Sequence, residues 1–162
     1  GCSSKTSMIE IQKHVYVEKE FKDSWLETNE FGDSYIKEEL QGGYHYHFDQ
    51  QFLEIFFNTG GKIELYNYSI KKNDLIISGE MIPPKTIRLV HPHLDNVTSE
   101  GVIIHELGHY FDEKHQFSSS KQFTELYKKY RTLFNQKTKK EYFAECFKEY
   151  VGGHQEIRQK NK

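Results

Sequence analysis

One segment constrains this chain more than any other: residues 102–112, which read VIIHELGHYFD. Apolar residues on both sides of His105 predict a buried helix. Residues four positions apart on a helix differ by about 40° in direction and one turn in height, so His105 and His109 face the same way. Two neutral imidazoles can bind one Zn²⁺, which keeps an open position for water when the protein supplies three ligands. We therefore expect one zinc ion on a buried helix.

Glu106 lies between the two histidines and can reach a water molecule on such an ion. Zinc lowers the pKa of its water toward ~7, and a neighbouring carboxylate can take the proton as the water attacks a carbonyl group. The alternative is a chance match on an amphipathic helix, because short motifs produce false positives. The uncharged flanks at residues 102–104 and Leu107 favour a metal site, with Glu106 as its general base.

A third ligand is required, and His115 is one candidate. It follows His109 by six residues, the offset at which one class of zinc proteases places a third histidine. That class normally has glycine at the position of Asp112 and a later methionine turn, whereas Met8 and Met81 both lie upstream. We therefore interpret His115 as a surface histidine. Asp112 is either a hydrogen-bond partner for a ligating histidine or a solvated helix residue.

The second candidate lies on a later helix, where Glu141 and Glu145 share one face. Two carboxylates in an otherwise apolar segment are costly unless they are paired. We favour Glu141 as the metal ligand and Glu145 as the group that hydrogen-bonds a ligating histidine. Thr138 and Glu141 also fit a capping box, and in that case Glu145 would be the ligand.

The order of the expected elements predicts an α+β fold. Hydrophobic spacing predicts helices over residues 18–26 and 48–57, and alternation predicts strands within residues 62–70, 74–78 and 85–91. From residue 98 onward the pattern is helical, with Thr98 or Ser99 and then Ser119 as N-caps, and a last helix over residues 140–151. Residues 1–17 show no clear period, so we divide the chain into an N-terminal segment, 1–17, and one domain, 18–162.

Composition excludes some partners. The net charge is −2, which gives no electrostatic basis for binding nucleic acid. No apolar run approaches the ~20 residues that span a bilayer. The start Gly-Cys-Ser-Ser-Lys is typical of a mature bacterial lipoprotein cut just before Cys2, or else of a cloning remnant. We therefore expect a monomer that is secreted or held at the cell surface of a bacterium, with membrane contact only through lipid on Cys2.

Two other histidine pairs alternate along extended sequence. They are His45 with His47, and His91 with His93 on either side of Pro92. Either pair could bind metal, but neither has acidic or cysteine companions. We interpret both as polar strand edges.

Several segments together resemble the catalytic domain of anthrax lethal factor and the related bacterial Pro-Pro endopeptidases. They are Ser99-Glu100-Gly101, residues 105–112, Ser120-Lys121-Gln122-Phe123 and residues 141–147, and the resemblance covers about residues 80–155. It implies a gluzincin-like zincin fold, with a small upper β-sheet lobe, a lower helical lobe and a cleft between them. It also implies Glu141 as the third ligand, Glu145 as its support, and an extended polypeptide substrate along an edge strand, here within residues 78–90.

One position departs from that family. The tyrosine that stabilises the oxyanion, seven residues before the ligand glutamate, is replaced by Phe134. Tyr130, one turn earlier, is our candidate substitute, and His154 is a weaker one. The resemblance therefore predicts a zinc metalloendopeptidase, with a proline preference that the residues themselves do not establish. The rival hypothesis is a zinc-binding interaction or inhibitor module with lost or weak catalysis.

Overall fold

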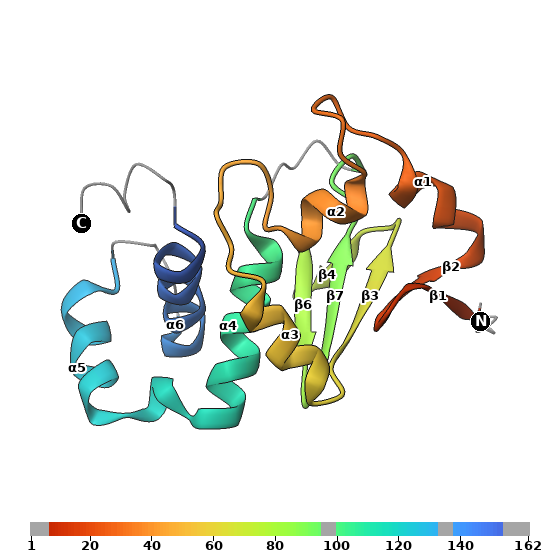
Figure 1. Ribbon diagram of the computed structural model, residues 1–162. Coiled ribbons are helices and arrows are strands. Elements are labelled where there is room, and N and C mark those ends of the chain that lie inside the picture. Colours follow the sequence, from red (N-terminus) through yellow and green to blue (C-terminus); the bar gives the residue numbers. More distant parts are fainter. Residues whose placement is uncertain (1–6, 95–99, 133–137, 154–162) are drawn as a thin grey trace.

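The computed structural model describes residues 7–94, 100–132 and 138–153. Its strands are β1 (Met8–Gln12), β2 (Val15–Glu18), β3 (Lys62–Tyr66), β4 (Ile70–Lys72), β5 (Leu75–Ile77), β6 (Gly79–Ile82) and β7 (Thr86–Val90). Its α-helices are α1 (Lys22–Leu26), α2 (Tyr35–Leu40), α3 (Gln51–Asn58), α4 (Val102–His115), α5 (Lys121–Tyr130) and α6 (Lys139–Phe147). Short 3₁₀ segments precede α1 (Lys19–Phe21) and α5 (Phe117–Ser119), and a π-helical turn (Lys148–Gly152) follows α6. The chain is therefore an α+β domain, as predicted (Figure 1).

Five strands form one sheet in the order β1-β2-β3-β7-β6. The three central strands, β2, β3 and β7, are parallel, and the two outer strands pair antiparallel with their neighbours. Register places six fully buried residues in two rows across the central strands: Val15, Ile63 and Ile87 in one row, and Val17, Leu65 and Leu89 in the other. The opposite face is charged, because Arg88 on β7 pairs with Glu64 on β3 and Glu80 on β6. One face of the sheet therefore forms the core.

The N-terminal segment departs from the sequence prediction. Within residues 1–17, the described part forms β1 and most of β2, which are integral strands of the sheet. The signal was present in the alternation of Ile9 and Ile11, then Val15 and Val17, on either side of a turn at His14, whose φ is +69°. Cys2 lies outside the described residues. No helix in the described ranges is both long enough and apolar enough to cross a bilayer.

Helix α4 lies between the sheet and α6, at the centre of the molecule (Figure 1). It is anchored by fully buried Ile103, Ile104 and Leu107. The predicted caps Thr98 and Ser99 lie outside the described residues, and the observed N-cap is Gly101, whose φ of +76° suits glycine. The helix that carries the two histidines is thus buried on its sheet side, as the apolar flanks predicted.

Close packing of α6 on α4 depends on small residues. A Cβ added at Gly108 would lie 3.0 Å from the Cα of Ala144 and 3.1 Å from the Cβ of Phe147. The absence of a side chain at Gly108 therefore lets the two backbones approach. This approach carries the carboxylates of α6 toward the histidines of α4.

The caps of the last two helices are side-chain hydroxyl groups. The N-cap of α5 is Ser120, one residue later than predicted, and it accepts a hydrogen bond from the backbone N–H of Phe123. Thr138 caps α6 by accepting from the N–H of Glu141 at 3.1 Å. The correction at Ser119 reflects a 3₁₀ turn that continues the chain through that residue before α5 begins.

Candidate metal centre

His105 and His109 project from one face of α4, as their spacing predicts. Their ring centroids are 4.9 Å apart and the rings are nearly perpendicular. Both side chains retain about a sixth of their accessible surface. The two imidazoles therefore face a common space that solvent can still enter.

Glu141, in the first turn of α6, completes the group. Its Oε2 is 3.1 Å from His105 Nε2, and its Oε1 is 2.9 Å from His109 Nε2. The three candidate ligand atoms lie within 4.8 Å of one another. Ligands about 2.0–2.1 Å from a tetrahedral zinc ion are separated by roughly 3.3 Å, so this set suits a zinc ion by donor type and by spacing.

Glu145, one turn further along α6, approaches His105 from the other side. Its Oε2 is 3.0 Å from His105 Nδ1. With Nδ1–H donating to this carboxylate, Nε2 carries the lone pair that a metal needs. Thr138 caps α6 through the backbone of Glu141 while the Glu141 side chain reaches the histidines. Only the Thr138 half of the expected capping box is present, because both carboxylate oxygens of Glu141 face the histidines instead of the N–H of Thr138.

The pKa values of His105 and Glu141 are shifted by their contacts with one another. Burial lowers the pKa of His105, but hydrogen bonds to Glu141 and Glu145 outweigh burial and raise it to about 9. Hydrogen bonds from His105 and His109 hold the pKa of Glu141 far below its ordinary value. The two carboxylates therefore favour a positive charge at His105.

Glu106 is only 6% exposed and lies in the same pocket as both histidines. Burial raises the pKa of its carboxyl group, and the positive charge of His105 and His109 opposes this only in part. A carboxylate whose proton affinity has been raised in this way is a better proton acceptor near neutral pH.

A pocket of about 410 Å³ opens over these residues. Its walls come from the β4–β5 hairpin (Lys72, Ile77), from β6 (Gly79, Glu80, Met81) and from the helices α4 and α6. Asn73 and Asp74 both have positive φ and form the tight turn of the hairpin. The pocket therefore lies between an edge of the main sheet and the helical part of the molecule.

The sheet edge beside this pocket is β6, the strand that sequence patterning missed. The predicted substrate region, residues 78–90, is in fact two antiparallel strands, of which only β6 is at the edge. The N–H of Val90 donates to the carbonyl of Ser78, which fixes the phase of the ladder. Because bonded and non-bonded pairs alternate, Glu80 and Ile82 bond to β7, while the backbone groups of Gly79 and Met81 point away from it. Those groups can pair with another extended chain.

Two further predicted site residues, Asp112 and Tyr130, lie in positions that do not match their predicted roles. Asp112 is buried and borders the pocket, but its Oδ1 accepts from the N–H of Ser118 at 2.7 Å, which holds the turn after α4. Tyr130, at the end of α5, is 37% exposed and is not among the residues that line the pocket. Phe134 and His154 lie outside the described residues.

Three other histidines in the described ranges have neighbours away from this centre. His115 is exposed and packs against Phe117, with ring centroids 5.2 Å apart, so it is outside the metal-ligating group. Nδ1 of His45 lies 2.7 Å from Oε1 of Glu100, within hydrogen-bond distance. His91 is buried at the end of β7, where its Nε2 contacts the carbonyl of Ser24 and its Nδ1 accepts from the N–H of His93.

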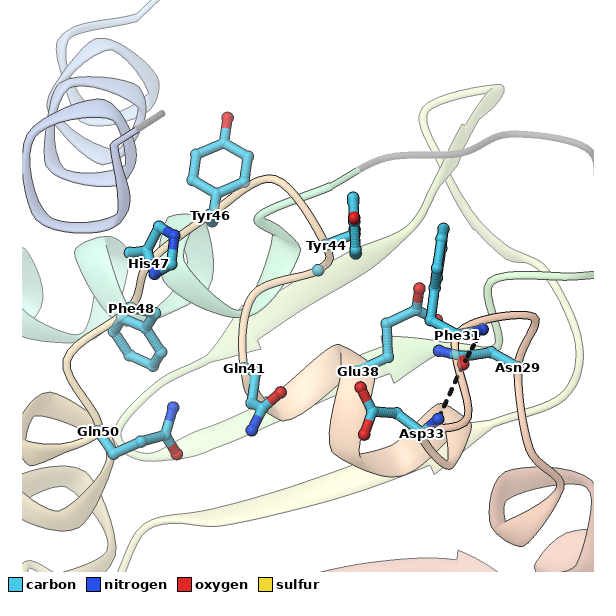
Figure 2. A pocket seen from close by; sticks show the side chains of 11 residues that line it. Asn29, Phe31, Asp33, Glu38, Gln41, Tyr44, Tyr46, His47, Phe48 and Gln50 are labelled. Atoms are coloured by element: carbon cyan, nitrogen blue, oxygen red, sulfur yellow. Dashed lines mark hydrogen bonds between the residues drawn. The ribbon is translucent and has the colours of Figure 1, made fainter. Parts of the chain in front are cut away.

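A second pocket, of about 320 Å³, lies in a different part of the fold, around α2 and the loop that follows it (Figure 2). Its most conspicuous feature is the exposed pair Phe31 and Tyr44, whose rings stack with centroids 4.2 Å apart. Asn29 holds the neighbouring loop by accepting from the N–H groups of Phe31 and Asp33. Within the described ranges, the residues lining this pocket contain no group that could hold a metal ion.

Sequence reasoning missed one partner of this centre. Lys148, directly after α6, places its Nζ 2.7 Å from Glu145 Oε1. The spacing of three residues between Glu145 and Lys148 was visible in the sequence, but such pairs are common on solvated helix faces.

No protein-family model matches the chain, and no curated protein matches it.

Proposed function

We propose that this protein is a zinc-dependent endopeptidase that hydrolyses peptide bonds in an extended polypeptide. One observation carries the proposal: two imidazoles and one carboxylate converge within 4.8 Å beside the buried carboxylate of Glu106. The resemblance of residues 105–112 and 141–147 to bacterial zincins such as the Pro-Pro endopeptidases is consistent with it. Zinc held by His105, His109 and Glu141 would supply a water of lowered pKa and would polarise the scissile carbonyl group.

Several residues around the metal centre then have defined tasks. Glu106, buried in the same pocket as both histidines, accepts the proton of the attacking water and passes it to the leaving amine nitrogen. Glu145 keeps His105 oriented through Nδ1. The outward backbone groups of Gly79 and Met81 bind the substrate as an added strand, which fixes the scissile bond across the pocket.

The rival function, a zinc-binding module with weak catalysis, has one observation in its favour. Among the described residues that line the pocket there is no tyrosine to stabilise an oxyanion, and Tyr130 is not one of them. Loss of a single oxyanion donor lowers the rate by about 10²–10³. A slow enzyme and a binding module therefore differ in whether any metal-dependent cleavage remains.

The experiment incubates the zinc-loaded protein with a peptide mixture that includes consecutive prolines and identifies the products by mass spectrometry. We expect cleavage that a chelator stops and zinc restores. Glu106→Gln should abolish cleavage while zinc binding persists. Glu125→Gln, an exposed change on α5, is the control and should leave both cleavage and zinc binding unchanged. Zinc binding without cleavage of any peptide would favour the module, and equal cleavage by Glu106→Gln would reject the mechanism.

A further inference from the structure

Lys148 occupies an unusual place for a lysine. Its side chain is only 15% exposed, and it opens the π-helical turn that follows α6. The turn is closed by a hydrogen bond from the N–H of Gly153 to the carbonyl of Lys148, five residues back. Wide turns of this kind are rare and occur frequently at functional sites. A partly buried ammonium group is costly unless it is paired, so its partners indicate why it is there.

The partners of Lys148 lead directly to the candidate metal centre. Its Nζ is 2.7 Å from Oε1 of Glu145, and the other oxygen of that carboxylate, Oε2, is 3.0 Å from Nδ1 of His105. Glu145 therefore bridges an ammonium group and an imidazole, with one oxygen for each. A carboxylate held at both oxygens cannot rotate to offer a different geometry to the histidine.

The rest of the environment fixes the ammonium group. Nζ lies 5.8 Å from the ring centre of Tyr46, which is labelled in Figure 2, and 3.9 Å from Oε1 of Glu149. Tyr46 donates its hydroxyl hydrogen to the same Glu149 oxygen. The aliphatic part of Lys148 fills the space above Gly101, where an added Cβ would lie 2.8 Å from its Cδ. The lysine is thus packed along its stem and held at its tip.

We propose that Lys148 is a positioning residue for the metal centre, acting through Glu145 on His105. It fixes the carboxylate so that Nδ1 of His105 donates to it and Nε2 faces Glu141. The inference rests on the proposed zinc site. It adds the contact of Lys148 with Glu145 behind the hydrogen bond between Glu145 and His105. The competing explanation is that Lys148 only ties α6 to the loop containing Tyr46, which would affect folding but not the metal.

The test measures zinc affinity by competition with a chromogenic chelator. Replacing a group that directly contacts a metal ligand costs about 10–100-fold in affinity. Lys148 acts one contact further out, through Glu145, so we expect Lys148→Met to weaken zinc binding by a measurable factor of up to about tenfold. Lys148→Arg, which keeps a cation, should recover most of that loss. Lys114→Met, an exposed change on α4, is the matched control and should bind zinc like the original protein. If Lys148→Met folds poorly, Lys148→Gln is used in its place, because glutamine keeps an aliphatic stem and a hydrogen-bond donor without the charge.

A double variant separates the two explanations. In a Glu145→Gln background, Lys148→Met should cost little further zinc affinity, because the residue through which it acts has already changed. An equal loss in both backgrounds, or unchanged zinc affinity in Lys148→Met, would overturn the inference. Failure of the original protein to bind zinc at all would instead reject the proposed function, so the two failures are distinguishable.

Discussion

Gly108 of α4 faces Ala144 of α6 so closely that a Cβ at Gly108 would lie 3.0 Å from the Ala144 Cα. This contact lies in the same helix pair that brings Glu141 and Glu145 to the two histidines. The distance between α4 and α6 therefore sets how closely the two carboxylates approach the histidines of the candidate metal centre.

Gly108→Val tests that link. The larger side chain must push α6 away, and overpacking of this kind typically costs about 1–3 kcal/mol. We expect a lower melting temperature and, because both carboxylates move with α6, weaker zinc binding. Lys114→Val puts the same side chain on the exposed face of α4 as a control. Unchanged zinc affinity in a folded Gly108→Val protein would show that the carboxylates do not depend on this approach.

The identity of the third ligand can be decided by two substitutions. Glu141→Gln removes the carboxylate that contacts both histidines, and we expect zinc affinity to fall by more than the roughly 100-fold that outer partners cost. His115→Gln alters an exposed ring outside the group and should leave zinc affinity unchanged. The reverse outcome, measured by the same chelator competition, would assign the site to a three-histidine class.

The metal-free protein should lose stability in alkaline solution because of His105. Its folded-state pKa of about 9 exceeds the ordinary value of 6.5, since Glu141 and Glu145 outweigh the effect of burial. A raised pKa stabilises the fold fully below pH 6.5, and this contribution disappears as the pH rises through about 9. Urea unfolding between pH 6 and 10 should therefore show a declining free energy of unfolding, and a smaller decline in His105→Asn. Equal slopes for the two proteins would mean that His105 does not hold its proton in this way.

The edge strand offers a test of substrate binding that leaves the metal centre alone. Met81→Pro removes an N–H that points away from β7, a position where sheets tolerate proline. We expect the fold to persist and kcat/KM for peptide cleavage to fall by up to about tenfold, since a hydrogen bond contributes about 0.5–1.5 kcal/mol. Glu80→Pro is the contrasting variant, because that N–H belongs to the ladder with β7, and it should lower the melting temperature. Full activity in Met81→Pro would argue against strand addition at β6.

The histidine pair could be predicted from sequence because the relation between His105 and His109 is local to one helix. Glu141 and Glu145 could be predicted because their shared helix face is also local, although their approach to α4 needed the packing at Gly108. The strand β6 was missed since Gly79 and the Pro83-Pro84 pair disguise a short edge strand. Lys148 was missed because its role comes from a π-helical turn and from Tyr46, about a hundred residues away in sequence, and such contacts leave no local pattern.

Metal content is the most direct test of the central claim, that His105, His109 and Glu141 hold one zinc ion. The folded protein, supplied with zinc and freed of excess, should contain one zinc per chain by elemental analysis. X-ray absorption of that sample should show two imidazole nitrogens and a carboxylate oxygen at about 2.0–2.2 Å. The paired variant His105→Ala with His109→Ala should retain no stoichiometric metal. A folded protein without bound zinc, or one whose zinc survives loss of both histidines, would contradict the assignment.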